Sequence, residues 1–460
     1  MAPKHSIGRF VQDLSCALLL FALAGCASVE VQRPAAAAAQ HPTIAEAQAL
    51  ARAHAGLSGK ARADNAARIE ALLAQLDDAT LSRDAARLAV GDPLYAFAGR
   101  ALLDRGLTLP RPFERGQWNF DAAGRPPADR DGYRPPVKVA LLLPLSGNQA
   151  AAAASVRDGF LTGYYGESRR KPEVRFYDTA NGANTAYGRA VAEGNDFVVG
   201  PLARDEVDAV FADDTPQVPL LALNRGSRMP PAGSASFSLS PEDEGISLAQ
   251  YLIEHGAKRV LIVAGGEDAQ RRSASEARGQ LERRGVRVVG NLTIGGDQAE
   301  ALRQLAQADG GVDGLLLAMK GSQARALLPQ MAIAGISAAN RVATSQITSG
   351  TGKAGEDVAL DGIVHPTETW STRGIPGLPS QASAAARLET ARGPAARLFA
   401  FGFDAWLVTA YLERLALSAN ADVAGATGRL SLDGFGNVLR QPSWSRFSGG
   451  VPVPLGDGAR

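Results

Sequence analysis

The chain has 460 residues, a formal net charge of +1 at pH 7 and two cysteines, Cys16 and Cys26. This length suggests several domains with buried cores, and a near-neutral charge gives no general case for nucleic-acid binding. Both cysteines lie near the amino terminus and the five histidines are scattered. We therefore expect no disulfide framework, no metal, no cofactor and no nucleic-acid partner.

The amino terminus has the pattern of a secretory signal, predicted over residues 1–25. Basic Lys4 and Arg9 precede an apolar stretch at residues 14–23, which is shorter than the roughly 20 residues of a membrane-spanning helix. Residues 23–26, Leu-Ala-Gly-Cys, resemble the lipobox of bacterial lipoproteins. That resemblance implies a lipid on Cys26 as the first mature residue, and Ala27, where an aspartate would favour the inner membrane, favours the outer membrane. The alternative is an ordinary secretory signal with an incidental cysteine.

Behind this signal the sequence predicts a tether and a small helical unit. Residues 26–42 lack hydrophobic periodicity and contain an alanine run, as flexible tethers do. Residues 43–109 are alanine-rich and predict helices, either stacked as hairpins or forming a simple stalk or bundle. Apolar residues recur there at the three- and four-residue spacing of an amphipathic helix: Ile69, Leu72, Leu73 and Leu76.

Residues 110–136 are rich in proline, glycine and charged residues, which predicts a linker. Within it Trp118 and Phe120 are expected to pack on a domain face. The tether, the helical unit and this linker together are expected to hold the large domain away from the membrane.

The large domain, predicted over residues 137–455, alternates short apolar runs with helical patterns. This alternation predicts α/β architecture, with parallel sheet flanked by helices. Two series split near residue 245 predict two Rossmann-like lobes, preceded by the all-α unit. An amphipathic helix is expected over residues 397–417, followed by a short strand pair. The expected strands are VKVALLLP, EVRFYDT, DFVVGP, VPLLALN and SFSLS in the first series, then RVLIVAGG, VRVVGNLTI and VDGLLLAMK.

No catalytic motif follows these strands. Ligands of open parallel sheets bind at the carboxyl ends of strands, yet no dinucleotide fingerprint GxGxxG follows the first strand. The sequence also holds neither a phosphate-binding loop GxxxxGK[ST] nor a nucleophile elbow GxSxG. Asp178 is interpreted as a strand-end carboxylate that caps the next loop. The adjacent Glu267 and Asp268 are interpreted as stabilising a helix amino terminus. We therefore expect no enzyme activity.

Two loops could bind an anion instead. Residues 146–148 and 200–204 each combine a tight turn with a helix start, whose free N–H groups suit a carboxylate or phosphate. Alternatively, they only turn the chain and cap helices. The arginines could meet an anion or an acidic partner bidentately, or Arg204 could pair with Asp205 or Asp208 or face solvent. The candidate cleft residues are Ser146, Gly147, Gly200, Pro201, Arg204, Asn224 and Arg225.

Several stretches resemble a known family. VALLLPLSG and the two lobes resemble the type I periplasmic binding protein fold. FVVGPLARDEVDAV, FSLSPEDEG and the tail GATGRLSLDGFGNVLRQPSWSRFSGGVPVPL, with the lipobox, resemble the LppC/LpoA group. The resemblance implies a lipoprotein anchored in the outer membrane, facing the periplasm and reaching toward peptidoglycan. Without catalysis of its own, it would activate a class A penicillin-binding protein, which is a peptidoglycan synthase. Members from enteric bacteria carry a longer helical domain than residues 43–109 provide.

The alternative is a solute-binding lipoprotein of an amino-acid transporter, or a small-ligand sensor. In such receptors, small hydroxyl side chains after the third and fourth strands hold the ligand's carboxylate and amine. The corresponding residues 202–205 and 224–226 lack hydroxyl groups, and Arg204 and Arg225 stand there instead. This departure favours an anionic ligand or none.

Overall fold

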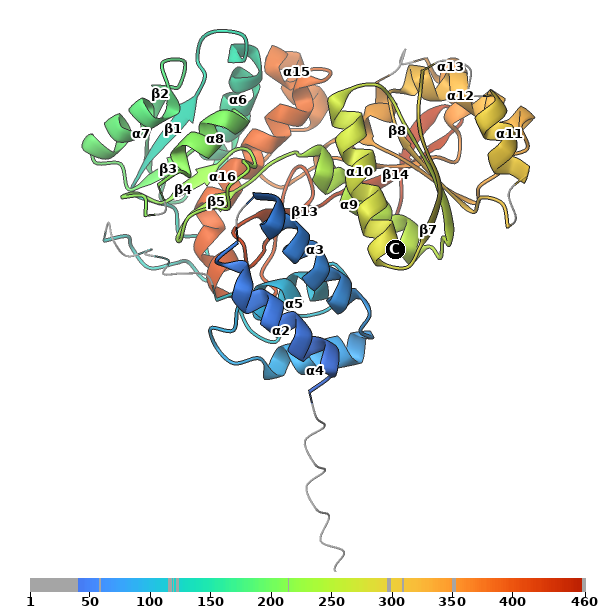
Figure 1. Cartoon of the computed structure of the whole chain (residues 1–460). Coiled ribbons are helices and arrows are strands. Elements are labelled where there is room, and N and C mark those ends of the chain that lie inside the picture. The colour runs from blue at the N-terminus through green and yellow to red at the C-terminus, as the bar shows by residue number, and fades with distance from the viewer. Residues whose placement is uncertain are drawn as a thin grey trace, which may run out of the picture. The chain divides into compact units, whose positions relative to one another are not determined.

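The computed structural model describes residues 40–57, 59–114, 118, 120, 124–213, 215–295, 299–307, 310–349 and 353–456 (Figure 1). The predicted signal peptide, Cys26 and the tether before Gln40 lie outside the described residues.

Residues 42–103 form helices around a core of their own. Asp77 begins one of them, because its Oδ1 accepts a hydrogen bond from the backbone N–H of Thr80 at 2.8 Å. The predicted apolar face is buried: Ile69 and Leu73 are at most 1% exposed and belong to the same core as Tyr95. The helices are α2 (Pro42–His54), α3 (Gly59–Ala74), α4 (Asp78–Arg87) and α5 (Leu94–Leu103).

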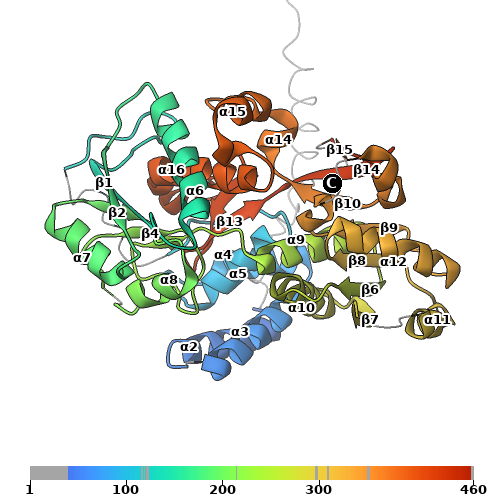
Figure 2. The ribbon, with the colours of Figure 1, turned by 90° about the horizontal axis from the view of Figure 1, so that it is seen from above.

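The first lobe is a parallel sheet in the order β2-β1-β3-β4-β5. Its central strands are apolar on both faces because helices cover both: α6 and α16 on one, α7 and α8 on the other (Figure 2). The predicted fifth strand is shorter and lies earlier than expected, at Ala235–Ser236. The elements are β1 (Lys138–Leu143), α6 (Ala150–Gly166), β2 (Glu173–Asp178), α7 (Ala183–Ala192), β3 (Phe197–Val199), α8 (Arg204–Val210), β4 (Leu220–Ala222) and β5.

The second lobe has a sheet in the order β15-β14-β10-β9-β8-β6-β7, in which β6 to β10 are parallel to one another and β14 (Ser443–Ser448) and β15 (Val451–Pro454) pair antiparallel. Its first helix begins with Ser240 as the cap and Pro241 in the first turn. The elements are α9 (Pro241–Glu254), β6 (Arg259–Ala264), α10 (Asp268–Arg283), β7 (Arg287–Thr293), α11 (Ala299–Gln307), β8 (Gly314–Ala318), α12 (Gly321–Ile333), β9 (Asn340–Ala343), η1 (Ser345–Thr348), α13 (Ala354–Asp357), η2 (Val358–Leu360) and β10 (Val364–Thr367).

The fold class predicted from the sequence, two lobes of parallel sheet flanked by helices behind a helical unit, is confirmed. Strands β9 and β10 were not expected. Their sequences are NRVA and VHPT. Each strand has only four residues, and polar residues or proline interrupt the apolar ones, so neither shows the apolar run that marks a buried strand. Tertiary packing, rather than local pattern, makes them strands.

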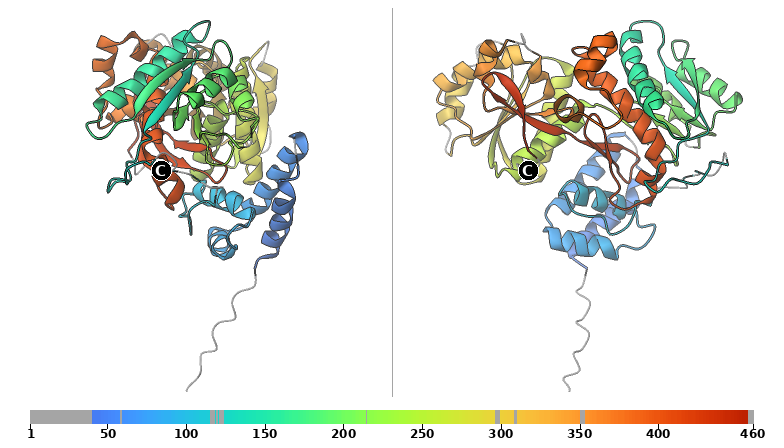
Figure 3. Two further views of the ribbon diagram at one scale, coloured as in Figure 1. Left: turned by 90° about the vertical axis from the view of Figure 1, so that its left-hand side faces the viewer. Right: turned by 180° about the vertical axis from the view of Figure 1, so that it is seen from behind.

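The chain then returns to the first lobe through α14 (Thr369–Arg373), α15 (Gln381–Arg387), η3 (Glu389–Ala391) and the long helix α16 (Ala395–Leu417). The helix expected over residues 397–417 is confirmed, but it is not amphipathic, since α16 lies alongside α6 (Figure 3) and most of its side chains are buried. Gly159 and Gly402 permit this approach, because a Cβ at either would overlap the backbone of the other helix. Among the described helices, α16 is long and apolar enough to cross a membrane, but 72% of its most apolar window is buried in the protein.

The carboxyl-terminal segment holds more than the predicted strand pair. β11 (Val423–Ala424), β12 (Arg429–Leu432) and β13 (Val438–Gln441) form a small antiparallel sheet beside the first lobe's core. β14 (Ser443–Ser448) and β15 (Val451–Pro454) then join the sheet of the second lobe. The chain therefore crosses between the lobes three times.

The predicted linker is bound to the first lobe along its described part. Phe120 belongs to the lobe's core and stacks on Trp118, as expected. Arg134 donates to Glu413 of α16 at 2.8 Å, and Tyr133 is 2% exposed. These contacts fix the described part of this segment against the first lobe.

Candidate functional site

Ser146 and Gly147, the first pair of candidate residues, are exposed after the carboxyl end of β1, and the Ser146 hydroxyl is bound by a carboxylate of the chain. Asp178 at the end of β2 accepts from the Ser146 hydroxyl at 3.1 Å and from the backbone N–H of Leu145 and Ala180 at 2.9 and 3.0 Å. These backbone hydrogen bonds lower the pKa of Asp178. Asp178 therefore ties two loops together, in agreement with its predicted capping role.

Gly200 and Pro201 are buried after β3 and shape the turn there. Gly200 has φ +110°, and a Cβ on it would overlap the backbone carbonyl of Leu142. The Pro201 carbonyl accepts from the Leu223 N–H at 2.9 Å. Neither residue lines a cavity identified among the described residues.

The other three candidates meet in a cavity of about 500 Å³ between the lobes, called here the inter-lobe cleft. The first lobe contributes the loops after β3 and β4, and the second contributes the start of α9 and Arg272 of α10. The lining residues are Leu202, Arg204, Leu223, Asn224, Arg225, Leu239, Ser240, Pro241, Glu242, Arg272, Leu398 and Phe401.

Asn224 and Arg225 already have partners in the chain. The Asn224 amide donates to the Leu202 carbonyl at 2.9 Å and accepts from the Arg225 N–H at 2.9 Å. The Arg225 guanidinium binds both carboxylate oxygens of Asp243, at 2.6 and 3.2 Å. The bidentate pairing considered from the sequence therefore exists, but its carboxylate belongs to this chain's own α9.

Arg204 is the cation left exposed at the cleft. Among the described residues no carboxylate forms an ion pair with it, and Asp208 accepts instead from the backbone N–H of Ser227 and Arg228, at 2.6 and 3.2 Å. Across the cleft Glu242 binds Arg272 at 2.7 and 2.9 Å. Burial opposes ionisation of Glu242, but Arg272 and the more distant Arg204 lower its pKa overall. The sequence did not indicate Glu242 or Arg272, because they come from the other lobe.

A second set of charges holds the lobes together beside the cleft. Arg397 of α16 lies 3.1 Å from Glu368 and 4.0 Å from Glu244, and also donates to the Ser345 hydroxyl. Glu244 in turn accepts from the Ser345 N–H at 2.7 Å. Burial acts to lower the pKa of Arg397, but these two carboxylates raise it overall.

The adjacent carboxylates Glu267 and Asp268 lie at the amino terminus of α10. Glu267 caps α10 and Asp268 begins it. Asp268 forms ion pairs with Arg271 and Arg272 at 3.6 and 3.5 Å, and Glu267 with Lys320 at 2.5 Å. Over the described ranges, no group of three or more histidine, cysteine, aspartate or glutamate side chains is placed to hold a metal.

A family model described as "LppC putative lipoprotein" matches residues 133–286 and 293–450, which is more than half of the chain. The chain belongs to the LppC family. Curated relatives carry the name "Penicillin-binding protein activator LpoA". The one from Photobacterium profundum is 28% identical over 360 residues, covering 69% of this chain and 57% of the relative. The one from Klebsiella pneumoniae is 26% identical, covering 61% and 44%. This LppC chain thus spans about half the length of the curated relatives it matches.

Solved structures share the fold of this LppC chain. The LpoA C-domain of Haemophilus influenzae, titled a regulator of PBP1A, superposes with a TM-score of 0.60 at 22% identity, covering 69% of this chain and all of that one. Full-length LpoA from the same organism superposes with a TM-score of 0.61 at 19% identity, and the match covers 90% of this chain and 78% of that one. A Chromobacterium violaceum protein, titled "putative branched-chain amino acid ABC transporter", superposes with a TM-score of 0.54 at 27% identity, and the match covers 68% of this chain and all of that one.

Proposed function

We propose that this LppC chain is a non-catalytic, lipid-anchored regulator that activates a class A penicillin-binding protein from the outer membrane. The observation that carries the proposal is the family match over both lobes, together with curated relatives named as penicillin-binding protein activators. The chain spans only part of those relatives, so the activation and the synthase partner are what we propose for it.

The anchor is the lipobox at residues 23–26. Acyl chains contribute roughly 0.8 kcal/mol per buried CH2, so several chains on Cys26 hold a protein at a membrane whereas one does not. The alanine-rich residues 35–39 then follow directly behind the lipid. An outer-membrane anchor puts the folded part in the periplasm, on the side where peptidoglycan is built.

The charges of the inter-lobe cleft support a binding and regulatory role over catalysis. Arg225 is held by Asp243 across the two lobes, and Glu242 is held by Arg272 within the second lobe, so both pairs have a structural role. Asp178 carries three hydrogen bonds from two loops, which lower its pKa and leave it a poor general base near neutral pH.

Recovery of the partner from its native envelope tests the proposal. The lipidated full chain, with an affinity tag at its carboxyl end, is crosslinked in intact cells and purified, and penicillin-binding proteins are detected with a fluorescent β-lactam. We expect one high-molecular-mass class A synthase to be enriched with the wild-type chain and depleted with Cys26→Ser. Recovery of no labelled synthase would contradict the proposal.

A second candidate function is solute binding. The Chromobacterium violaceum match and the exposed Arg204 at a cavity of about 500 Å³ favour it. Thermal unfolding with leucine, isoleucine and valine tests it, because a ligand bound by the folded state alone raises Tm. A saturable rise in Tm that is lost in Arg204→Gln would favour a solute receptor over the activator as the function of this chain. An unchanged Tm would leave the activator as the better account.

A further inference from the structure

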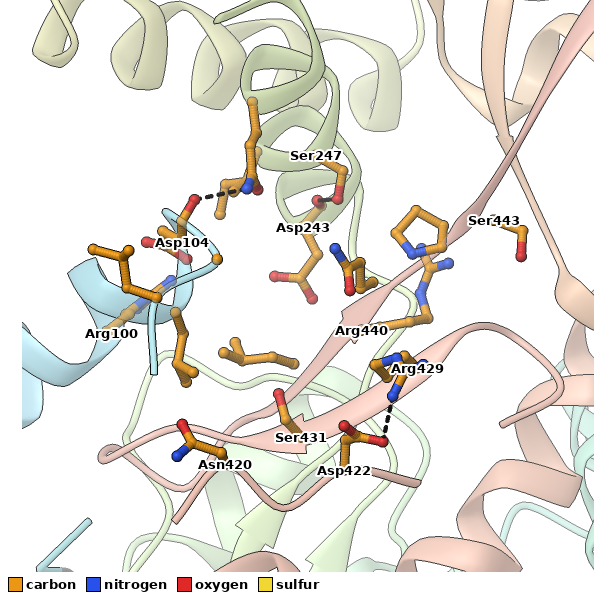
Figure 4. Close-up of a pocket in the computed structure, with 18 of the residues that line it drawn as sticks. Arg100, Asp104, Asp243, Ser247, Asn420, Asp422, Arg429, Ser431, Arg440 and Ser443 are labelled. Carbon is orange, nitrogen blue, oxygen red and sulfur yellow. Dashed lines mark hydrogen bonds and ion pairs between the residues drawn. The ribbon is translucent and has the colours of Figure 1, made fainter. Parts of the chain in front are cut away.

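A second cavity, the junction cavity, lies where the helical unit, α9 and the carboxyl-terminal strands meet (Figure 4). It has a volume of about 380 Å³, within the range of small-molecule sites. It has no lining residue in common with the inter-lobe cleft. Nothing in the sequence indicated it, because its walls come from segments more than 300 residues apart.

Three chain segments close around this cavity through direct contacts. The Asn420 side chain accepts from the Leu109 N–H at 2.5 Å and donates to the Leu109 carbonyl at 3.3 Å. Gln250 of α9 donates to the Asp104 carbonyl at 2.6 Å. A molecule bound inside would therefore contact the helical unit and the two-lobed domain together.

Arg440 is the unusual member of the cavity wall. The residue is 9% exposed, and within the described part of the chain its guanidinium donates from Nη1 to the Thr427 carbonyl at 3.2 Å. Its Nε is buried without a hydrogen-bond partner, and among the described residues no carboxylate lies within ion-pair distance. Burial first, and then Arg397, lower the pKa of Arg440 overall, while Glu244, Glu368 and Asp243 act in the opposite direction from beyond ion-pair distance. A buried cation without a paired anion is costly, and an incoming carboxylate removes that cost.

The other arginines around the cavity are already paired, so they do not compete for such an anion. Arg429 binds Asp422 at 2.7 Å (Figure 4), and Arg100 lies 4.0 Å from Asp433. The Arg440 guanidinium thus marks one end of a ligand.

Asp104 supplies the opposite charge on the α5 side of the cavity. Within the described residues its carboxylate makes neither a hydrogen bond nor an ion pair, and burial raises its pKa to about 6 in spite of Arg100. A ligand ammonium beside it would restore the charged form. Apolar side chains also line the cavity: Leu103, Leu107, Leu109, Ile246 and Leu432.

We propose that the junction cavity binds an amino acid or short peptide with free termini, its carboxylate on Arg440 and its ammonium facing Asp104. The balance of basic and acidic side chains around the cavity favours such a zwitterion over a phosphate or another polyanion. The proposal is independent of the activator function, since it concerns binding of a small molecule by this chain alone and not activation of a synthase.

Calorimetric titration of the full-length chain with three probes tests the proposal. The probes are trialanine, trialanine amide, which lacks the carboxylate, and N-acetyl trialanine, which lacks the ammonium. We expect saturable binding of trialanine and about tenfold weaker binding of each blocked form, because a charge-assisted hydrogen-bonded pair contributes on that scale. Absence of saturable trialanine binding, or equal binding of all three probes, would overturn the proposal.

Variants place the bound peptide. Arg440→Gln should weaken trialanine about tenfold and abolish the preference over the amide, and Asp104→Asn should abolish the preference over the acetylated form. The control Arg446→Gln, an exposed β14 residue outside the cavity, should bind as wild type. Binding that Arg204→Gln removes and Arg440→Gln leaves intact would put the peptide in the inter-lobe cleft and overturn the proposal.

A cavity-filling variant covers the case in which Arg440→Gln fails to fold. Ser431 lines the cavity (Figure 4), and its hydroxyl makes no hydrogen bond among the described residues. Ser431→Trp should keep the chain folded by circular dichroism and abolish trialanine binding. Undiminished binding to this folded variant would overturn the proposal.

Discussion

The guanidinium of Arg225 and the carboxylate of Asp243 form a bidentate ion pair across the two lobes, with N–O distances of 2.6 and 3.2 Å. Arg225 lines the inter-lobe cleft and Asp243 lines the junction cavity, so this pair stands between the two. Asp243 also lies in the first turn of α9, where its N–H is capped by the Ser240 hydroxyl at 3.1 Å. One ion pair thus links the first lobe to the helix that begins the second.

Breaking this pair should destabilise the chain. Arg225→Gln leaves the mostly buried Asp243 carboxylate without its cation, and we expect the free energy of unfolding in urea to fall by about 2 kcal/mol. Arg429→Gln breaks the more exposed pair with Asp422 and should cost under about 1 kcal/mol. Equal losses in the two variants would show that the inter-lobe pair holds nothing together.

The close packing of α6 on α16 gives a second prediction. Gly402→Ala puts a methyl group against the Val156 backbone, so one helix must shift, and we expect a loss of about 3 kcal/mol. Gly188→Ala in α7 is the matched control, since nothing lies within 4 Å of its Cβ position. It should be neutral or stabilise by about 0.5–1 kcal/mol. Chemical denaturation of both variants measures the difference, and a tolerated Gly402→Ala would argue against the close approach.

Much of the fold could be predicted from the sequence because parallel strands covered on both faces are continuous apolar runs, such as β1 and β6. β9 and β10 could not, since their pairing comes from neighbours far along the chain. The helix over residues 397–417 was expected, but its buried surroundings were not. Its polar residues are few, and one of them, Asp404, is itself buried by the strands that follow.

The buried Asp404 predicts a pH dependence of stability. It accepts from the Ala426 N–H and from both the N–H and the hydroxyl of Thr427, yet burial dominates and raises its pKa to about 7. In the unfolded chain the value is near 3.8. Between these values the folded state binds more protons, so the free energy of unfolding falls as pH rises, by up to about 1.4 kcal/mol per pH unit.

Comparison with Asp404→Asn isolates that contribution. The variant cannot ionise, so its unfolding free energy should lose this slope between pH 4 and about 7. Other groups, such as His365, whose pKa is lowered by burial, contribute equally to both proteins and cancel in the difference. Identical pH profiles for the variant and the wild type would refute a raised pKa at Asp404.

The predicted lipid attachment is tested by labelling. An alkyne-bearing fatty acid fed to cells should be incorporated into the wild-type chain and not into Cys26→Ser. The variant should shift from the outer-membrane fraction to the soluble periplasm, because it loses the acyl chains that hold it. Cys16→Ser should behave as wild type, since its position lies inside the predicted signal. Label on Cys26→Ser would contradict the lipobox interpretation.

The candidate site was predictable in part. Arg204, Asn224 and Arg225 follow strands of the first lobe, and the rule that ligands lie at strand ends placed them at the cleft. Ser146 and Gly147 also follow a strand, but the Ser146 hydroxyl is already hydrogen-bonded to Asp178. The partners from the second lobe, Asp243 and Arg272, carry no local signal, because the way the lobes pack decides which face they meet.

The central claim is tested most directly by a reconstituted synthase. A class A penicillin-binding protein from the same cell is placed in liposomes with lipid-linked disaccharide-peptide substrate. The initial rate of peptide crosslinking is then measured as the folded, lipidated chain is added, with the heat-unfolded chain as control. The account predicts a saturable, severalfold rise in crosslinking that the unfolded chain does not produce. An unchanged rate with every class A synthase of that cell would contradict it.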